Sequence, residues 1–207
     1  MKRTLLAAAL LVTVGAANAT VSISGSPAYI SFSNYNGAPL AQTGPQSTGL
    51  QDALLVSDNS FDRVTATFLG KEAAHIDQFW VNGSLVFNSL AAVPSSYGPF
   101  AMGSPLSFAF KDSNDGTNVN NGGNLLAFAS YVVLGTKDRA GLFTPFHGLS
   151  NQYSYVLGFN DGSKIDADYD DLVVGFKVTA VPEPGTYALM LAGLGAIGFI
   201  ARRRRAS

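Results

Sequence analysis

Five aspartates fall within eleven residues in the last third of the chain. They are Asp161, Asp166, Asp168, Asp170 and Asp171, and Lys164 is the only basic residue among them. Carboxylate oxygens that converge suit a hard cation, and calcium takes about six to eight oxygens at about 2.3–2.6 Å. We therefore interpret these five residues as candidate calcium ligands.

Two alternatives to a calcium site stay open. The spacing does not make an EF-hand, because Asp171 stands where that loop needs glycine and Lys177 stands where it needs glutamate. A solvated acidic loop, with its side chains in water, would use the same residues. A catalytic role for the carboxylates is the third reading.

The strand that follows sets the limits of this acidic stretch. Its apolar positions alternate at Leu172, Val174, Phe176 and Val178. Were the strand to start at Ile165, alternation would turn three of the aspartates toward the core, and burying unpaired carboxylates costs many kcal/mol. The sequence therefore predicts a loop that becomes a strand near Asp170.

The rest of the middle region also has the pattern of strands. Short segments rich in β-branched and aromatic residues, separated by Gly, Asn, Asp, Ser and Pro, predict strands at Val21–Phe32, Val64–Leu69, Leu106–Phe110, Leu125–Leu134, Tyr153–Phe159 and Leu172–Val178. Alternation is clearest in residues 64–68, 106–110 and 153–159, and it predicts one buried face for each of these three segments. Asn82-Gly83 predicts a type I′ hairpin within Gln78–Phe87.

These elements predict an all-β fold, an antiparallel β-sandwich of jelly-roll-like type. We expect a short helical turn near Lys71–His75 and a polar loop over Asp112–Asn124. An N-terminal signal helix and a C-terminal transmembrane helix complete the predicted fold.

Charge and composition exclude several functions. The chain has 13 Lys/Arg and 14 Asp/Glu, but six of the basic residues and one acidic residue lie in the two ends, which leaves seven against thirteen in residues 20–180. This acidic body argues against nucleic-acid binding. With no cysteine and only His75 and His147, the sequence shows no recognisable zinc site, and both histidines are expected on the surface or in loops.

Catalytic motifs are absent, so we expect no enzyme. Nucleophile-elbow, P-loop and dinucleotide glycine patterns do not occur. Glu72 is the only glutamate of the middle region, and a polysaccharide hydrolase that pairs it with an aspartate is a weak alternative. Six aromatic residues could instead stack on a glycan, although a core role is expected for most: Trp80, Tyr97, Phe100, Tyr131, Tyr153 and Tyr155.

The N-terminus has the organisation of an export signal. Lys2 and Arg3 precede the apolar run Leu5–Val14, which as a helix covers about 15 Å, too short for a lasting span. Ala17 and Ala19 supply the small residues that signal peptidase reads. We therefore expect residues 1–19 to be removed and the body to occupy residues 20–180.

The C-terminus combines an extended motif, an apolar run and a basic cluster. Val181, Pro182, Glu183 and Pro184 precede the apolar run 187–201, which would extend about 22 Å as a helix. Since Pro disfavours helix immediately before it, the motif is expected to be extended and accessible. Arg202, Arg203, Arg204 and Arg205 would stay in the cytoplasm.

In this order, residues 181–207 closely resemble the PEP-CTERM sorting tail of exported proteins in Gram-negative bacteria. The resemblance implies that an exosortase, a membrane-embedded cysteine transpeptidase or protease, cuts the tail near Pro-Glu-Pro. The inner membrane would then be a transient partner, and the product would reach the cell surface or the extracellular space.

The middle region has a second resemblance. Gly158-Phe159-Asn160-Asp161-Gly162 followed by the segment Asp168–Val174 is similar to the closing motif of DUF4114-type bacterial surface domains. Segments Leu69–Ala74 and Val81–Gly83 also resemble exosortase-dependent surface proteins. These similarities imply an extracellular β-rich domain with a suspected cation site, although Asp170 replaces the more usual Asn.

Together the patterns predict an exported, exosortase-sorted, noncatalytic surface or biofilm-matrix protein, with calcium as a candidate stabiliser and an exopolysaccharide as a candidate partner. A secreted glycan- or ice-binding module is the alternative. An extracellular polysaccharide hydrolase is the weaker one.

Overall fold

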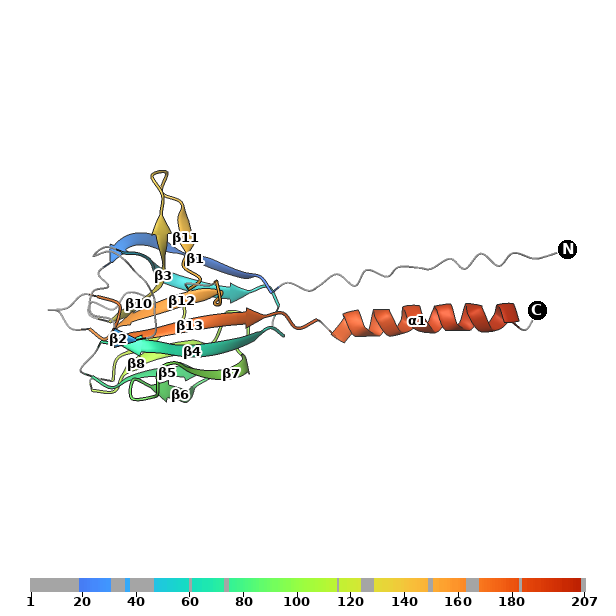
Figure 1. Cartoon of the computed structure of the whole chain (residues 1–207), viewed down its shortest axis with the longest axis horizontal. Helices are drawn as coiled ribbons and strands as arrows, with labels where there is room; N and C mark the ends of the chain where they lie inside the picture. The colour runs from blue at the N-terminus through green and yellow to red at the C-terminus, as the bar shows by residue number, and fades with distance from the viewer. Residues whose placement is uncertain are drawn as a thin grey trace.

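The computed structural model shows a β-rich body from which one helix projects (Figure 1). It describes residues 19–30, 36–37, 47–59, 61–72, 75–114, 116–123, 129–148, 151–162, 168–182 and 184–205. The predicted all-β class is confirmed, with antiparallel sheets and one C-terminal apolar helix. The predicted signal helix and Ala17 lie outside the described residues.

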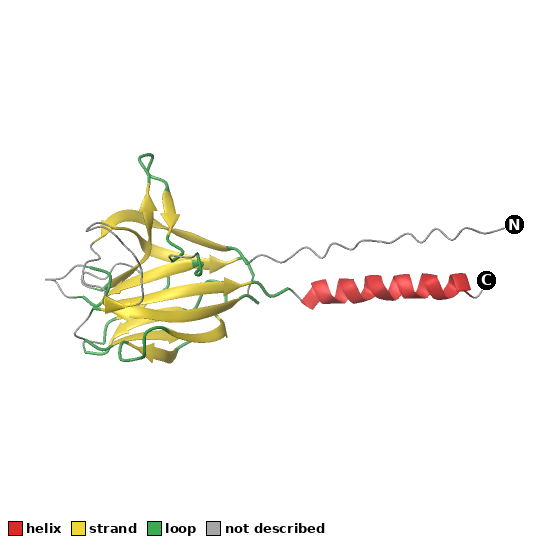
Figure 2. Ribbon diagram, viewed as in Figure 1, coloured by secondary structure: helices red, strands yellow, loops and turns green. Residues whose placement is uncertain are grey.

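The strands among the described residues form two antiparallel sheets (Figure 2). The larger has the order β1 (Val21–Ile30), β3 (Ser47–Ser57), β10 (Ser130–Lys137), β12 (Tyr155–Asn160), β13 (Leu172–Thr179), β4 (Arg63–Lys71) and β2 (Asn36–Gly37), with β11 (Phe143–Pro145) paired to β10 and β7 (Ser95–Ala101) paired to β4. The smaller has the order β6 (Ser84–Asn88), β5 (Asp77–Val81), β8 (Phe108–Asp112) and β9 (Asn118–Asn120).

Aromatic side chains join the two sheets in one core. Phe110 of the smaller sheet stacks on Phe159 of the larger, with ring centroids 5.1 Å apart and an interplanar angle of 9°. Phe79 and Phe108 meet Phe176 edge-on at 5.6 and 5.0 Å. Because all five are at most 4% exposed, their burial supplies a large part of the driving force for packing the sheets together.

The centre of the larger sheet is buried on both faces, so the expectation of a single buried face is wrong for β12. Two consecutive residues of the neighbouring strand β10 illustrate this double burial. Val133 faces the shared core, whereas Val132 joins a second apolar cluster with Tyr169 on the other face. Tyr169 can pack against this second face because residue 158 is a glycine. A Cβ on Gly158 would lie 2.3 Å from the Tyr169 carbonyl oxygen.

Most strand predictions are confirmed within a few residues, and the hairpin is confirmed in detail. Asn82 and Gly83 both have positive φ, 50° and 75°, between the paired residues Val81 and Ser84, as a type I′ turn requires. The predicted polar loop 112–124 needs correction, because Asp112 ends β8 and residues 118–120 form β9 on its edge. Of the predicted turn near Lys71–His75, Lys71 ends β4 and residues 73–74 lie outside the described part.

The sequence analysis did not predict β3, which has 11 residues and is the longest of the described strands. It lies between β1 and β10 and buries Leu50, Ala53 and Leu55. A bulge interrupts its pairing with β1, and Asp52 within it has a positive φ of 51°. The extra residue breaks the simple alternation by which a strand is recognised in a sequence.

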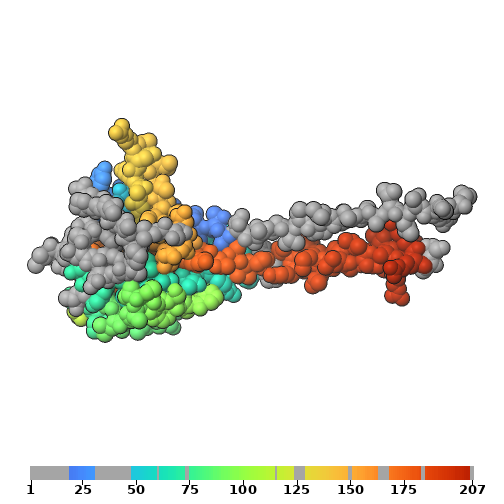
Figure 3. Space-filling view, viewed as in Figure 1, coloured from blue at the N-terminus to red at the C-terminus, as the bar shows by residue number. Residues whose placement is uncertain are grey.

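The helix α1 (Pro184–Arg205) stands apart from the body (Figure 3). Its large apolar side chains are exposed, from 40% for Met190 to 77% for Leu189, and none belongs to either core cluster. At 22 residues it extends about 33 Å, comparable with the roughly 30 Å of hydrocarbon in a bilayer. The helix therefore exceeds the predicted run 187–201 at both ends, and its last turn carries the four arginines.

Candidate metal centre and sorting tail

Acidic residues gather where four strands begin or end. Asp77 opens β5 and Asp112 closes β8, while Asp161 follows β12 and Asp171 precedes β13. These ends lie at one pole of the body, and since β13 runs from this pole toward α1, the pole faces away from the helix (Figure 1). Eight strand residues separate the two ends by about 26 Å.

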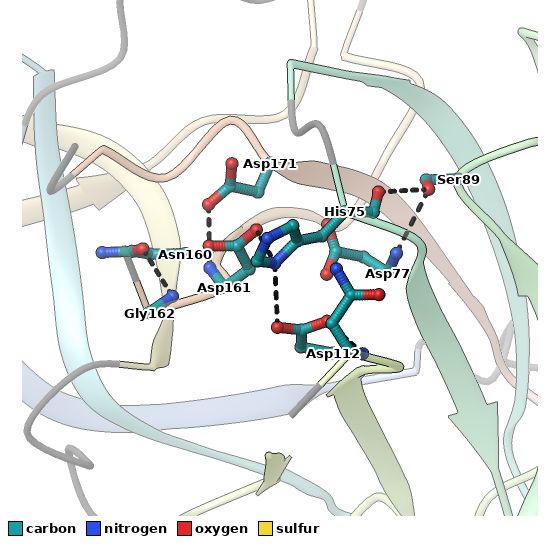
Figure 4. Close-up of polar contacts among 9 residues, drawn as sticks. His75, Asp77, Ser89, Asp112, Asn160, Asp161, Gly162 and Asp171 are labelled. Atoms are coloured by element: carbon teal, nitrogen blue, oxygen red, sulfur yellow. Dashed lines mark hydrogen bonds and ion pairs between the residues drawn. The ribbon is translucent and has the colours of Figure 1, made fainter. Parts of the chain in front are cut away.

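His75 joins carboxylates from both sheets (Figure 4). Its Nδ1 lies 3.0 Å from Oδ2 of Asp112 and 3.2 Å from Oδ2 of Asp161. These three ligand atoms lie within 4.8 Å of one another, and the two aspartates are buried. The hydrogen bond with Asp112 is the main cause that raises the pKa of His75, which favours the imidazolium in the absence of a metal.

Asp77 adds a fully buried carboxylate beside this group. It is 0% exposed, and neither carboxylate oxygen has a hydrogen-bond partner among the described residues. It pairs directly with Asp112 across β5 and β8, a register that places the two acidic side chains opposite each other. Burial, aided by the charges of Asp161, Asp171 and Asp112, raises the pKa of Asp77 to about 9. The pole therefore concentrates negative charge that needs a proton or a cation.

Asp171 ties the end of β12 to the start of β13. One carboxylate oxygen accepts a hydrogen bond from the backbone N–H of Asp161 at 2.8 Å. Burial is the main cause that raises the pKa of Asp171 to about 7, while the hydrogen bond works in the opposite direction. This contact holds Asp161 in place next to His75.

The predicted calcium ligands have different fates. Asp166 lies outside the described residues, and the other four are all at most 6% exposed, so they are not solvated as the loop alternative required. Asp161 belongs to the group with His75, whereas Asp168 and Asp170 do not. As predicted, the strand after the acidic stretch starts late, at Leu172.

Sequence reasoning missed three residues of the pole: His75, Asp77 and Asp112. No motif spacing links them, because the register of β5 against β8 and the packing of the two sheets bring them together. Two signals were available in the sequence: Asp77 stands just before the predicted hairpin Gln78–Phe87, and Asp112 stands shortly after the predicted strand Leu106–Phe110. His75 lies between strands, as expected of a loop histidine, but it also contacts two buried carboxylates.

The sorting segment leaves the body at the opposite pole. Only residues 180–183 lie between β13 and α1, and they span at most about 14 Å. The loop after β3 holds this segment: the side-chain amide of Asn59 donates to the Val181 carbonyl at 3.0 Å, and the Val181 N–H donates to Asp62 at 3.3 Å. Glu183 lies outside the described residues. The body is thereby held close to the start of the helix.

Comparison with known proteins identifies the tail. Residues 180–205 match the family model of the PEP-CTERM protein-sorting motif. No curated protein and no solved structure matches the chain. The resemblance of the middle region to DUF4114-type domains stays a prediction. The chain thus carries a PEP-CTERM sorting tail, which makes it a membrane-anchored precursor destined for the cell surface with an exosortase as its processing partner.

Proposed function

We propose that the protein is a noncatalytic structural component of the cell surface or extracellular matrix, with a body stabilised by a divalent cation at the pole that faces away from the membrane. The observation that carries this proposal is the separation of tasks within the chain. The apolar helix and its arginines contribute nothing to either core cluster, so the tail can serve sorting alone while the body serves outside.

We propose two cuts, one at each end of the body. Signal peptidase would release the N-terminus after Ala19, and the exosortase would later remove α1 near Pro-Glu-Pro. Because Val181 is bound to the body, the cut that frees the folded product falls after this residue. An exopolysaccharide is the proposed partner of the released body.

Taken without His75, the cluster of aspartates would favour calcium, because hard oxygen ligands suit it. The burial of Asp161 and Asp171 beside Asp77 supports a bound cation, since a buried group of carboxylates is costly without one. A stabilising rather than catalytic role fits a site that joins the ends of strands.

A glycan-stacking surface is less well supported. Trp80, the only tryptophan, has Lys111 Nζ 3.7 Å from the ring centroid, and its indole N–H donates to Gln78. One face of the ring is therefore already occupied by a cation. In the part of the chain that the structure describes, no observation favours the ice-binding or the hydrolase alternative.

The proposed function is tested by surface labelling in a host with and without its exosortase. A reagent that cannot cross membranes reacts with lysines of the body, such as Lys137. We expect labelling on intact cells only where the exosortase is present, with the precursor retained in the inner membrane elsewhere. Equal surface labelling in both hosts would refute exosortase-dependent display.

A further inference from the structure

The pole holds a nitrogen ligand that an acidic calcium loop does not need. Building on the proposed cation-stabilised body, we propose that this site binds a first-row transition-metal dication, with zinc as the probe, through His75 Nδ1 and the Oδ2 atoms of Asp112 and Asp161. Two of these three ligands, His75 and Asp112, lie outside the acidic stretch.

The spacing of the three ligand atoms fits such an ion. Bonds of about 2.0–2.1 Å in a tetrahedral site place neighbouring ligand atoms about 3.3 Å apart. The two distances from His75 Nδ1 are 3.0 and 3.2 Å, and all three atoms lie within 4.8 Å of one another. Small side-chain movements would therefore complete three bonds.

Asp77 independently points to a bound cation. Its carboxylate is fully buried, lacks a hydrogen-bond partner among the described residues, and points toward His75 and Asp161 in Figure 4. Leaving a buried charge without compensation is expensive, and a metal ion would compensate it directly. Asp77 is not among the three residues whose ligand atoms all lie within 4.8 Å of one another, so it would become a fourth ligand only by moving toward the metal.

The ligand chemistry distinguishes the metals. Calcium takes oxygen ligands, whereas imidazole suits zinc and its neighbours in the first transition row. The side chain of His75 is 44% exposed, so an ion can enter from solvent while the aspartates remain buried. On binding, the metal replaces the proton of His75 Nδ1, which is released to solvent.

Such an ion would connect the two sheets. Asp112 ends a strand of the smaller sheet, Asp161 follows β12 of the larger, and His75 lies on the connection from β4 to β5. The shared aromatic core holds the sheets together along their length. The metal would fix their ends at the pole farthest from α1.

The test uses the full chain in detergent, stripped of metal, with zinc and calcium added separately. Trp80 fluorescence gives the melting temperature and calorimetry gives the affinity. Zinc at about 100 times its Kd should raise the melting temperature by about 5–10 °C, whereas calcium should not.

Variants separate ligands from structural side chains. His75→Ala should weaken zinc binding at least about tenfold, while the matched control His147→Ala, which removes the other histidine, should leave the affinity unchanged. Asp77→Asn should also weaken zinc binding without lowering the metal-free melting temperature, because a neutral side chain of the same shape replaces a carboxyl group whose charged form is costly to bury.

A calcium response that survives His75→Ala would overturn the transition-metal site and leave the cation-stabilised body standing. If neither metal raises the melting temperature, both this inference and the cation part of the proposed function fail. The surface-labelling experiment tests sorting independently of either result.

Discussion

Phe110→Ala should lower the free energy of unfolding by about 3–5 kcal/mol. Phe110 is fully buried and touches rings from both sheets, with centroids 5.2 Å from Phe79, 5.6 Å from Tyr131 and 5.1 Å from Phe159. Removing the ring leaves a cavity where the sheets meet, which neighbouring rings can fill only in part. Urea denaturation of the full chain in detergent measures the change.

Tyr29→Ala serves as the control for this prediction. Tyr29 is also an aromatic residue in a strand but is 78% exposed, so its loss should change the stability by less than about 0.5 kcal/mol. A cost below about 1 kcal/mol for Phe110→Ala would mean that the two sheets do not share the core described above.

Ending the chain after Pro182 should abolish membrane retention and leave the fold intact. The truncation removes α1, whose apolar side chains are exposed, but keeps Val181 and its hydrogen bonds to Asn59 and Asp62. We expect the melting temperature to stay within about 2 °C of the full-length value, equivalent to less than about 1 kcal/mol. Cell fractionation and thermal melts measure the two effects.

A truncation that removes more of the chain provides the matched control. Ending the chain after Val174 also removes Phe176, which packs against Phe79 and Phe108, and should prevent folding. If the chain ending at Pro182 were unfolded too, α1 would be part of the folding unit and the separation of tasks would be wrong.

Local signals explain how far the fold could be predicted. Asn82-Gly83 fixes a turn by backbone conformation, and the alternation in β4 and β13 reports a buried face, so these elements were found. β3 was missed because its bulge at Asp52 disturbs the alternation. The double burial of β12 depends on Tyr169 and its neighbours covering the second face, which a period of two cannot reveal.

The candidate site was harder to predict from the sequence than the fold, because its residues are brought together by long-range strand pairing. Asp161 and Asp171 were found because they are close in sequence, and one carboxylate does contact the other residue's N–H. Asp77 and Asp112 are 35 positions apart and meet only through the register of β5 and β8. No short motif encodes such a register, and His75 was set aside because no cysteine or second histidine lies nearby in sequence.

The mass of the intact protein recovered from the surface of its native host tests most directly whether the body is complete without its ends. We expect a chain that begins at Thr20 and ends shortly after Val181, with any group that the exosortase attaches adding to the mass. A surface form that still contains α1 and the four arginines would contradict this account, because the helix would then be a permanent anchor.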